Sequence, residues 1–228
     1  MKKGRCRAAS FFYEVMMNKA ILFDMVGVLV LSEALTAKAG VAAMQEFGIT
    51  CKESDFLQFV GTGEAGYMGG VAELYGKSYV PEMTEKLYAA YGALIGAEQK
   101  PKNLDAVLTA LKSRGYLLAV CSSANALKVG YNLQAIGYGT DFFDAVITGS
   151  DVTKNKPEPD VFLLGAERMG ALPEKCIVIE DAVNGVKAAH AGGMPAVAVC
   201  STLDKQTLLT QAQPDYIVDT LEAILDIL

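Results

Sequence analysis

Several features that would assign this chain to a particular class are missing from its sequence. It has no basic patch of the kind that binds nucleic acid, and its 26 acidic residues outnumber its 20 lysines and arginines. No apolar run reaches the roughly 18–20 residues that a membrane span requires. Internal repeats and low-complexity segments are absent as well. We therefore expect a globular protein that binds neither nucleic acid nor a membrane.

The cysteines and the first residues bear on the compartment. The five cysteines are odd in number and scattered, and no pair has the CxxC spacing of a metal or redox site. Cys121, Cys176 and Cys200 lie in or beside apolar runs, as buried thiols in a reducing compartment do. We therefore expect a cytoplasmic protein. Residues 1–16 predict a disordered tail, and an organelle-targeting peptide is the alternative.

What the sequence does contain is an alternation of short apolar runs with helical patterns. Apolar runs end at Phe23, Cys121, Ile147, Ile179 and Val199. They lack polar alternation, as strands that are buried on both faces of a parallel sheet do. Because helical patterns separate the strands, the chain is expected to form an α/β core with a doubly wound parallel sheet.

One long segment interrupts this alternation directly after the first strand. Glu33–Phe47 and Glu82–Ile95 have helical character, and Gly61–Gly66 is expected to be a flexible loop. Nothing in this part of the chain alternates with period two. The sequence therefore predicts an inserted, all-helical cap domain. The expected boundaries are 1–16 for the tail, 17–33 and 102–228 for the core, and 34–101 for the cap.

Polar groups stand where the buried strands end. Asp24 follows the first strand, Ser122 the second and Glu180-Asp181 the fourth, while Lys156 precedes the helix after the third. The carboxyl ends of parallel strands share one edge of the sheet, so these groups can converge. Converging carboxylates repel unless a hard cation lies between them, and oxygen ligands suit Mg²⁺. With a lysine and a hydroxyl nearby, such a site can hold a phosphoryl group that a carboxylate attacks.

Each of these groups alone has an ordinary structural explanation. Asp24 can cap a turn, Ser122 can cap the helix that follows it, and the acidic pair can complement a helix dipole. Lys156 can be a surface lysine. Their joint occurrence, in order and always near strand ends, is much more specific than any one of them.

Four short motifs occur in a fixed order along the chain. They are Phe23-Asp24-x-x-Gly27-Val28-Leu29, Val120-Cys121-Ser122-Ser123, Lys156-Pro157-x-Pro159-Asp160-Val161-Phe162 and Val178-Ile179-Glu180-Asp181-Ala182-x-x-Gly185-Val186-x-Ala188-Ala189. Together they resemble the haloacid dehalogenase superfamily, in its β-phosphoglucomutase-like phosphatase branch with a helical cap. The resemblance implies a Mg²⁺-dependent phosphatase that acts on a small phosphorylated metabolite through an aspartyl-phosphate.

The resemblance also implies roles for individual residues. The implied catalytic residues are Asp24, as nucleophile, Ser122 and Lys156. The implied metal ligands are Asp24, the backbone carbonyl of Val26, Asp181 and, supporting them, Glu180. The expected substrate contacts are Ser123, Asn125 and Glu64, the last of these on the cap loop.

Two positions depart from the family pattern. The family has an aspartate two residues after the nucleophile, which protonates the leaving oxygen and later activates water, and Val26 stands there in this chain. A further aspartate, five residues downstream, is Leu31 here. Because general acid–base catalysis contributes ~10²–10⁴-fold, we expect an impaired phosphatase or one that needs a good leaving group. The alternative is an inactive protein that binds a phosphorylated ligand or a partner.

Other activities of the superfamily are less favoured. Sugar-phosphate mutases carry a cap histidine and a cap arginine, whereas this chain has Thr36 and Glu64 at the matching positions. The only histidine, His190, is expected at the surface. Phosphonate hydrolases need a cap lysine, and no cap lysine lies in a recognised motif here. The expected assembly is a monomer or a weak dimer.

Overall fold

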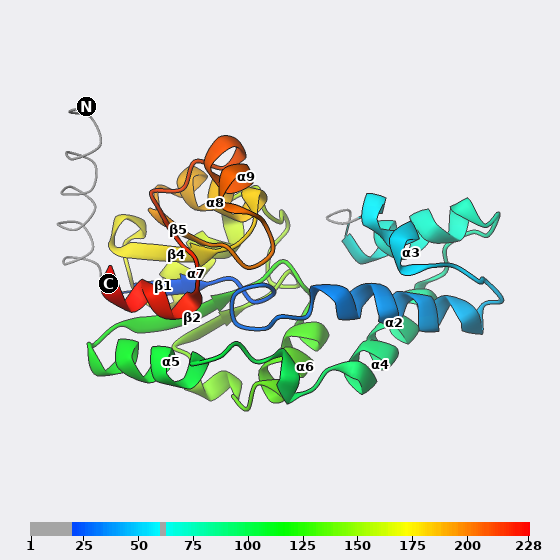
Figure 1. Cartoon of the computed structure of the whole chain (residues 1–228), viewed down its shortest axis with the longest axis horizontal. Coiled ribbons are helices and arrows are strands. Elements are labelled where there is room, and N and C mark those ends of the chain that lie inside the picture. The colour runs from blue at the N-terminus through cyan, green and yellow to red at the C-terminus, as the bar shows by residue number, and fades with distance from the viewer. Residues whose placement is uncertain (1–19, 60–62) are drawn as a thin grey trace. The chain divides into compact units, whose positions relative to one another are not determined.

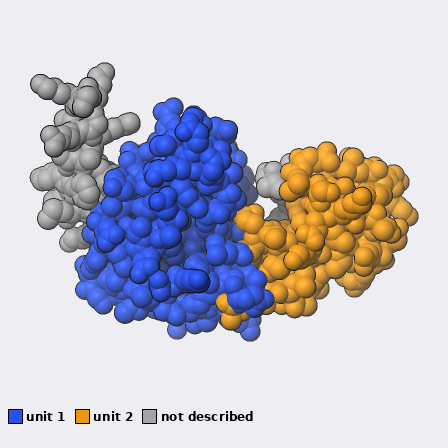
Figure 2. All heavy atoms as spheres, viewed as in Figure 1, with its two compact units in different colours: residues 1–31, 98–228 blue, residues 32–97 orange. Residues whose placement is uncertain are grey.

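The computed structural model of the chain describes residues 20–59 and 63–228 (Figure 1). The expected tail, residues 1–16, lies outside the described residues. Two compact units divide the chain, a core unit made of residues 1–31 and 98–228 and a cap unit made of residues 32–97 (Figure 2). No helix among the described residues is long and apolar enough to cross a membrane.

The core unit contains a six-stranded sheet with the strand order β3-β2-β1-β4-β5-β6. Every neighbouring pair is parallel, which confirms the predicted doubly wound sheet. The order changes direction between β1 and β4, and ligands of such sheets bind at that point. The strands are β1 (Ala20–Phe23), β2 (Leu117–Cys121), β3 (Ala145–Ile147), β4 (Cys176–Glu180), β5 (Ala196–Val199) and β6 (Tyr216–Val218).

The central strand β1 is covered on both faces. All four of its residues have no exposed surface. Successive side chains point to opposite faces of a strand. Ala20 and Leu22 belong to the core that is shared with α7 (Asp160–Arg168) and α8 (Val183–Ala191), so the other two side chains face the opposite layer. An apolar run without alternation is the direct result of this double coverage.

Helices form a layer on each side of the sheet, with α8 and α9 above it and α5 below it in Figure 1. One helix, α9 (Lys205–Gln211), was missed by the sequence analysis because only Leu208 in it is buried, which leaves no apolar periodicity. The C-terminal end of this unit forms a 3₁₀ helix, η5. The remaining elements of this unit are α5 (Leu104–Ser113), α6 (Ala126–Ala135), η3 (Thr140–Phe142), η4 (Pro173–Lys175) and η5 (Leu221–Asp226).

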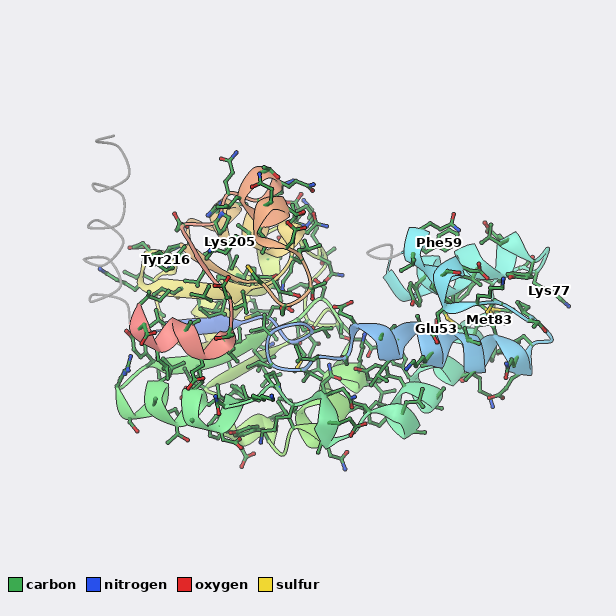
Figure 3. The ribbon with its side chains drawn as sticks, viewed as in Figure 1. Glu53, Phe59, Lys77, Met83, Lys205 and Tyr216 are labelled. Carbon is green, nitrogen blue, oxygen red and sulfur yellow. The ribbon has the colours of Figure 1, made fainter. Side chains whose placement is uncertain are left out.

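The cap unit is all-helical, as predicted. Its interior holds Met83, whereas Lys77 projects from its surface (Figure 3). Residues 63–66 were expected in a loop, but they form the first turn of α3. Gly70 of this helix packs against an aromatic ring, since a Cβ there would lie 2.3 Å from Phe59 Cε1. The elements are α2 (Glu33–Glu46), η1 (Glu53–Phe59), α3 (Gly63–Leu74) and α4 (Pro81–Leu94), followed by η2 (Ala97–Gln99) at the unit boundary.

Two glycines inside core helices provide a matched test of this packing. A Cβ on Gly165 of α7 would lie 2.7 Å from Cys121 Sγ and 3.0 Å from Leu22 Cδ2, whereas a Cβ on Gly130 of α6 would meet open space. We expect Gly165→Ala to lower the free energy of unfolding by about 1 kcal/mol or more through overpacking. Gly130→Ala should raise it by roughly 0.5–1 kcal/mol, because alanine favours the helix. Urea denaturation of both variants measures the difference, and equal effects would contradict the packing described.

Candidate active site

Asp24 lies at the carboxyl end of β1, at the switch point of the sheet. Its backbone N–H donates to the carbonyl of Ile179 in β4 at 2.9 Å. The chain then turns sharply, and the N–H groups of Leu29 and Val30 both donate to the carbonyl of Met25 at 2.9 Å. These bonds hold the nucleophile candidate beside the end of β4, with its side chain buried.

Lys156 is the cation of the site, and three oxygens surround its ammonium group. Its Nζ lies 2.5 Å from Asp24 Oδ1, 2.8 Å from Glu180 Oε1 and 3.1 Å from the carbonyl oxygen of Cys121. An ammonium has three protons to donate, so these oxygens match its capacity. The ring of Phe162, 4.6 Å from Nζ, adds a cation–π contact.

Glu180 is held on both of its carboxylate oxygens. Oε1 accepts from Lys156, and Oε2 accepts from the backbone N–H groups of Asp181 and Ala182, each at 2.8 Å. Gly185, in the first turns of α8, leaves the room that this carboxylate occupies, because a Cβ there would lie 1.7 Å from Oε1. The spacing between the acidic pair and this glycine therefore has a steric cause.

Three buried carboxylates meet at this edge of the sheet. Asp24, Glu180 and Asp181 each offer an oxygen, and these atoms lie within 4.8 Å of one another. A Cβ on Gly27, whose φ is +88°, would lie 1.9 Å from Asp181 Oδ2, so only glycine leaves room for that carboxylate. Three carboxylates against one ammonium leave buried negative charge in excess. An all-oxygen donor set of this kind fits Mg²⁺.

Burial and the neighbouring charges together shift the pKa values of Asp24 and Lys156. Burial, the largest influence, raises the pKa of Asp24 to about 7, with Glu180 adding to the rise and Lys156 opposing it. Burial by itself would lower the pKa of Lys156, but Asp24 and Glu180 outweigh it and raise that pKa above its usual range. Lys156 is therefore charged. A cation on the carboxylates would act as Lys156 does and favour ionised Asp24.

Ser122 and Asn125 lie in the loop after β2. Ser122 is buried, its N–H donates to the carbonyl of Ile147 at 3.0 Å, and its Oγ accepts from the N–H of Ala124 at 3.1 Å. Asn125, expected as a substrate contact, is the N-cap of α6, where its Oδ1 accepts from the N–H of Lys128 at 3.0 Å. The helix backbone therefore engages the side-chain oxygen of Asn125.

The remaining residues singled out from the sequence differ in their position and exposure. Ser123 is exposed in the loop after β2. Val26 lies in the turn after Asp24 and is partly buried. Glu64 belongs to the cap unit, and its side chain lies outside the described residues. His190 is exposed, as expected, and its Nε2 lies 2.9 Å from Asp215 Oδ2.

Sequence analysis gave no role to three groups that lie at the site. They are the Cys121 carbonyl and the Phe162 ring, which both face Lys156, and Thr202, whose Oγ1 would lie 2.7 Å from a Cβ on Gly27. Phe162 is the last residue of the motif that begins at Lys156, which is a usable signal. Thr202 lies in the loop after β5, and no motif marks it.

Comparison with known proteins identifies the family. The haloacid dehalogenase-like hydrolase family matches residues 18–193. The chain belongs to this family. The chain is 39% identical over 209 residues to Protein SUPPRESSOR OF QUENCHING 1, chloroplastic, of Arabidopsis thaliana, a match that covers 88% of this chain but 19% of that protein. This hydrolase thus spans about a fifth of that relative's length.

Two further likenesses support the assignment. Phosphoglycolate phosphatase of Escherichia coli K12 is 33% identical over 118 residues, which are 52% of this chain and 46% of that enzyme. The crystal structure of CbbY from Rhodobacter sphaeroides in complex with phosphate matches with a TM-score of 0.78 and 22% identity, over 90% of this chain and 95% of that one. At 22% identity, the match to CbbY shows a shared fold and nothing more.

The charge balance of the site predicts what happens to stability when the ammonium group of Lys156 is removed. Lys156→Met leaves three buried carboxylates without an ammonium and should lower the free energy of unfolding by about 3 kcal/mol, measured by urea denaturation without divalent cations. Lys187→Met, at an exposed position of α8, is the control and should change it little. If both variants are equally stable, Lys156 does not balance the buried charge.

Proposed function

We propose that this hydrolase is a Mg²⁺-dependent phosphatase that acts on a small phosphorylated metabolite, with Asp24 as its nucleophile. The observation that carries the proposal is the buried arrangement in which Lys156 contacts both Asp24 and Glu180. An acidic nucleophile, a fixed ammonium and further carboxylates are the groups that phosphoryl transfer needs. Relatives with phosphatase names, such as the phosphoglycolate phosphatase, support the reaction class.

Each residue has a part in the proposed reaction. An oxygen of Asp24 attacks phosphorus and forms an aspartyl-phosphate, while Lys156 and Ser122 hold the phosphoryl oxygens. Asp24, Asp181 and the backbone carbonyl of Val26 would bind Mg²⁺, with Glu180 supporting them. The ion would neutralise phosphoryl charge when bound. The proposed additional substrate contacts are Ser123, the amide nitrogen of Asn125 and, on the cap, Glu64.

Val26 limits the rate in this proposal. A valine side chain neither gives a proton to the leaving oxygen nor takes one from water. Loss of general acid–base catalysis lowers a rate by ~10²–10⁴-fold. The enzyme should therefore favour substrates whose leaving groups need no proton, and ordinary alkyl phosphates should react slowly.

The same residue favours a second candidate function. With Val26 and the exposed Leu31 in place of acids, the fold can bind a phosphorylated ligand without turning it over. Such a protein would act as a binding partner. The tests below separate it from a weak phosphatase, because binding and turnover are measured independently.

Restoring the acid is the decisive substitution. We expect Val26→Asp to raise kcat on alkyl phosphate esters by ~10²–10⁴-fold, because the new carboxyl can move the proton. Val26→Asn is the matched control, since its amide has the same shape but transfers no proton. Phosphate release from a panel of aryl and alkyl phosphates, with and without Mg²⁺, provides the measurement.

The outcomes of that comparison differ in meaning. Slow turnover by the native chain and a gain in Val26→Asp alone support an impaired phosphatase. Turnover in neither chain eliminates the phosphatase proposal. Stabilisation by phosphate together with no native turnover supports the binding protein.

Metal binding is testable without turnover. If Mg²⁺ binds the three carboxylates, a concentration 100-fold above its Kd should raise the free energy of unfolding by about 2.7 kcal/mol, measured by thermal denaturation against a chelated sample. Asp181→Asn should remove most of this gain. Asp219→Asn, whose side chain is 80% exposed, should retain it. If Mg²⁺ stabilises both variants equally, the ion does not bind at the three carboxylates.

A further inference from the structure

The described core unit gives Asp24 few neighbours that could move a proton. Its titratable contacts are Lys156, which is charged, and Glu180, whose two oxygens already accept three hydrogen bonds. Asp181, the third carboxylate, lies among the oxygens suited to a cation. A general base needs a lone pair directed at water, and the bonds that hold Glu180 leave it poorly suited to that task.

The turn after Asp24 contains no other side chain that could carry the proton. Met25, Val28 and Leu29 are apolar and buried, and Val26 between them is apolar as well. Backbone hydrogen bonds fix this turn, because the N–H of Gly27 donates to the carbonyl of Val30 at 2.7 Å. The turn therefore keeps apolar side chains next to the reacting group.

The chain's histidine lies at the other edge of the sheet. His190 contacts Asp215, and the same carboxylate oxygen accepts from the N–H of Ala196 at 2.9 Å. Ala196 begins β5, so this pair lies at the amino end of the strands, whereas Asp24 lies at the carboxyl end. His190 is not placed to serve as the base.

Loss of the proton carrier affects the two halves of the reaction differently. In the first half, a bond forms between an Asp24 oxygen and phosphorus, and the leaving group departs with the electron pair of its P–O bond. An alcohol is about as weak an acid as water, so its oxygen needs a proton to leave. The carboxylate of an acyl phosphate, with a pKa of about 4, leaves without one.

In the second half, a water oxygen attacks phosphorus and the Asp24 oxygen departs as a carboxylate. The departing carboxylate needs no proton, but the attacking water must lose one. Val26 stands where the family has the acceptor of that proton. The second half is therefore slowed even for a phosphodonor that makes the first half easy.

We propose that Asp24 takes a phosphoryl group from acyl phosphates and retains it, so that the phosphorylated chain accumulates as a long-lived form. The proposal rests on Asp24 being the nucleophile of the proposed phosphatase. It adds the class of phosphoryl donor and makes hydrolysis of the aspartyl-phosphate the rate-limiting step. Lys156, held by Glu180 and the Cys121 carbonyl, remains next to the phosphorylated oxygen and stabilises its charge.

The test uses acetyl phosphate and the full chain with Mg²⁺. Intact-protein mass spectrometry should show a gain of one phosphoryl group that hydroxylamine removes, as it removes acyl phosphates, and Asp24→Asn should abolish the gain. After the donor is removed, the adduct in Val26→Asp should disappear ~10²–10⁴-fold faster than in the native chain. Val26→Asn is the matched control and should keep the long lifetime.

The results separate this inference from the proposed function. Release of phosphate from acetyl phosphate by the native chain without an adduct overturns the inference and leaves the phosphatase proposal standing. An adduct that decays equally fast in the native chain and in Val26→Asp also overturns it. Absence of both adduct and turnover in the native chain and in a folded Val26→Asp variant removes the inference and the phosphatase proposal together.

Discussion

The structure depends on one buried ammonium group and the carboxylates around it. The side chain of Lys156 is 7% exposed and contacts Asp24, which directly follows β1, and Glu180, which ends β4. Buried charges are tolerated only when they are paired and hydrogen-bonded, so this lysine joins two neighbouring strands at the switch point of the sheet. The loop that carries Lys156 arrives from beyond β3, so three separate parts of the chain are fixed by one group. The excess of carboxylates over this ammonium is what makes the edge suited to a divalent cation.

Glycine positions complete that arrangement and explain the spacing of the motifs. Gly27 turns the chain after Asp24 in the left-handed region and leaves room for the Asp181 carboxylate. Gly185 leaves room for Glu180 at the start of α8. In both cases a Cβ would lie less than 2 Å from a carboxylate oxygen, so the motif spacing records a steric requirement as well as a chemical one.

Sequence reasoning was most accurate where burial leaves a simple pattern. The apolar runs that end at Phe23, Cys121, Ile147 and Val199 form strands that end at those residues, and the run that ends at Ile179 forms β4, which extends one residue further. It failed where little is buried, as in α9, or where glycines suggested a loop, as at the start of α3. The four motifs gave the acidic residues and Lys156, which the structure brings together. The Cys121 carbonyl and Thr202 could not be predicted, because a backbone group and a loop residue from a distant strand reach the site only through the fold.

Charge balance and proton transfer are physically separable in this site. Removing Lys156 leaves buried carboxylates without their partner, which destabilises the fold itself. The position of Val26 carries no such constraint, because it lies in a turn of apolar residues that is fixed by backbone hydrogen bonds. An apolar residue there leaves the hydrogen bonds of Lys156 and Glu180 intact and removes only a proton carrier. A chain can therefore keep every charged group of the site for reasons of stability even where it lacks a proton carrier.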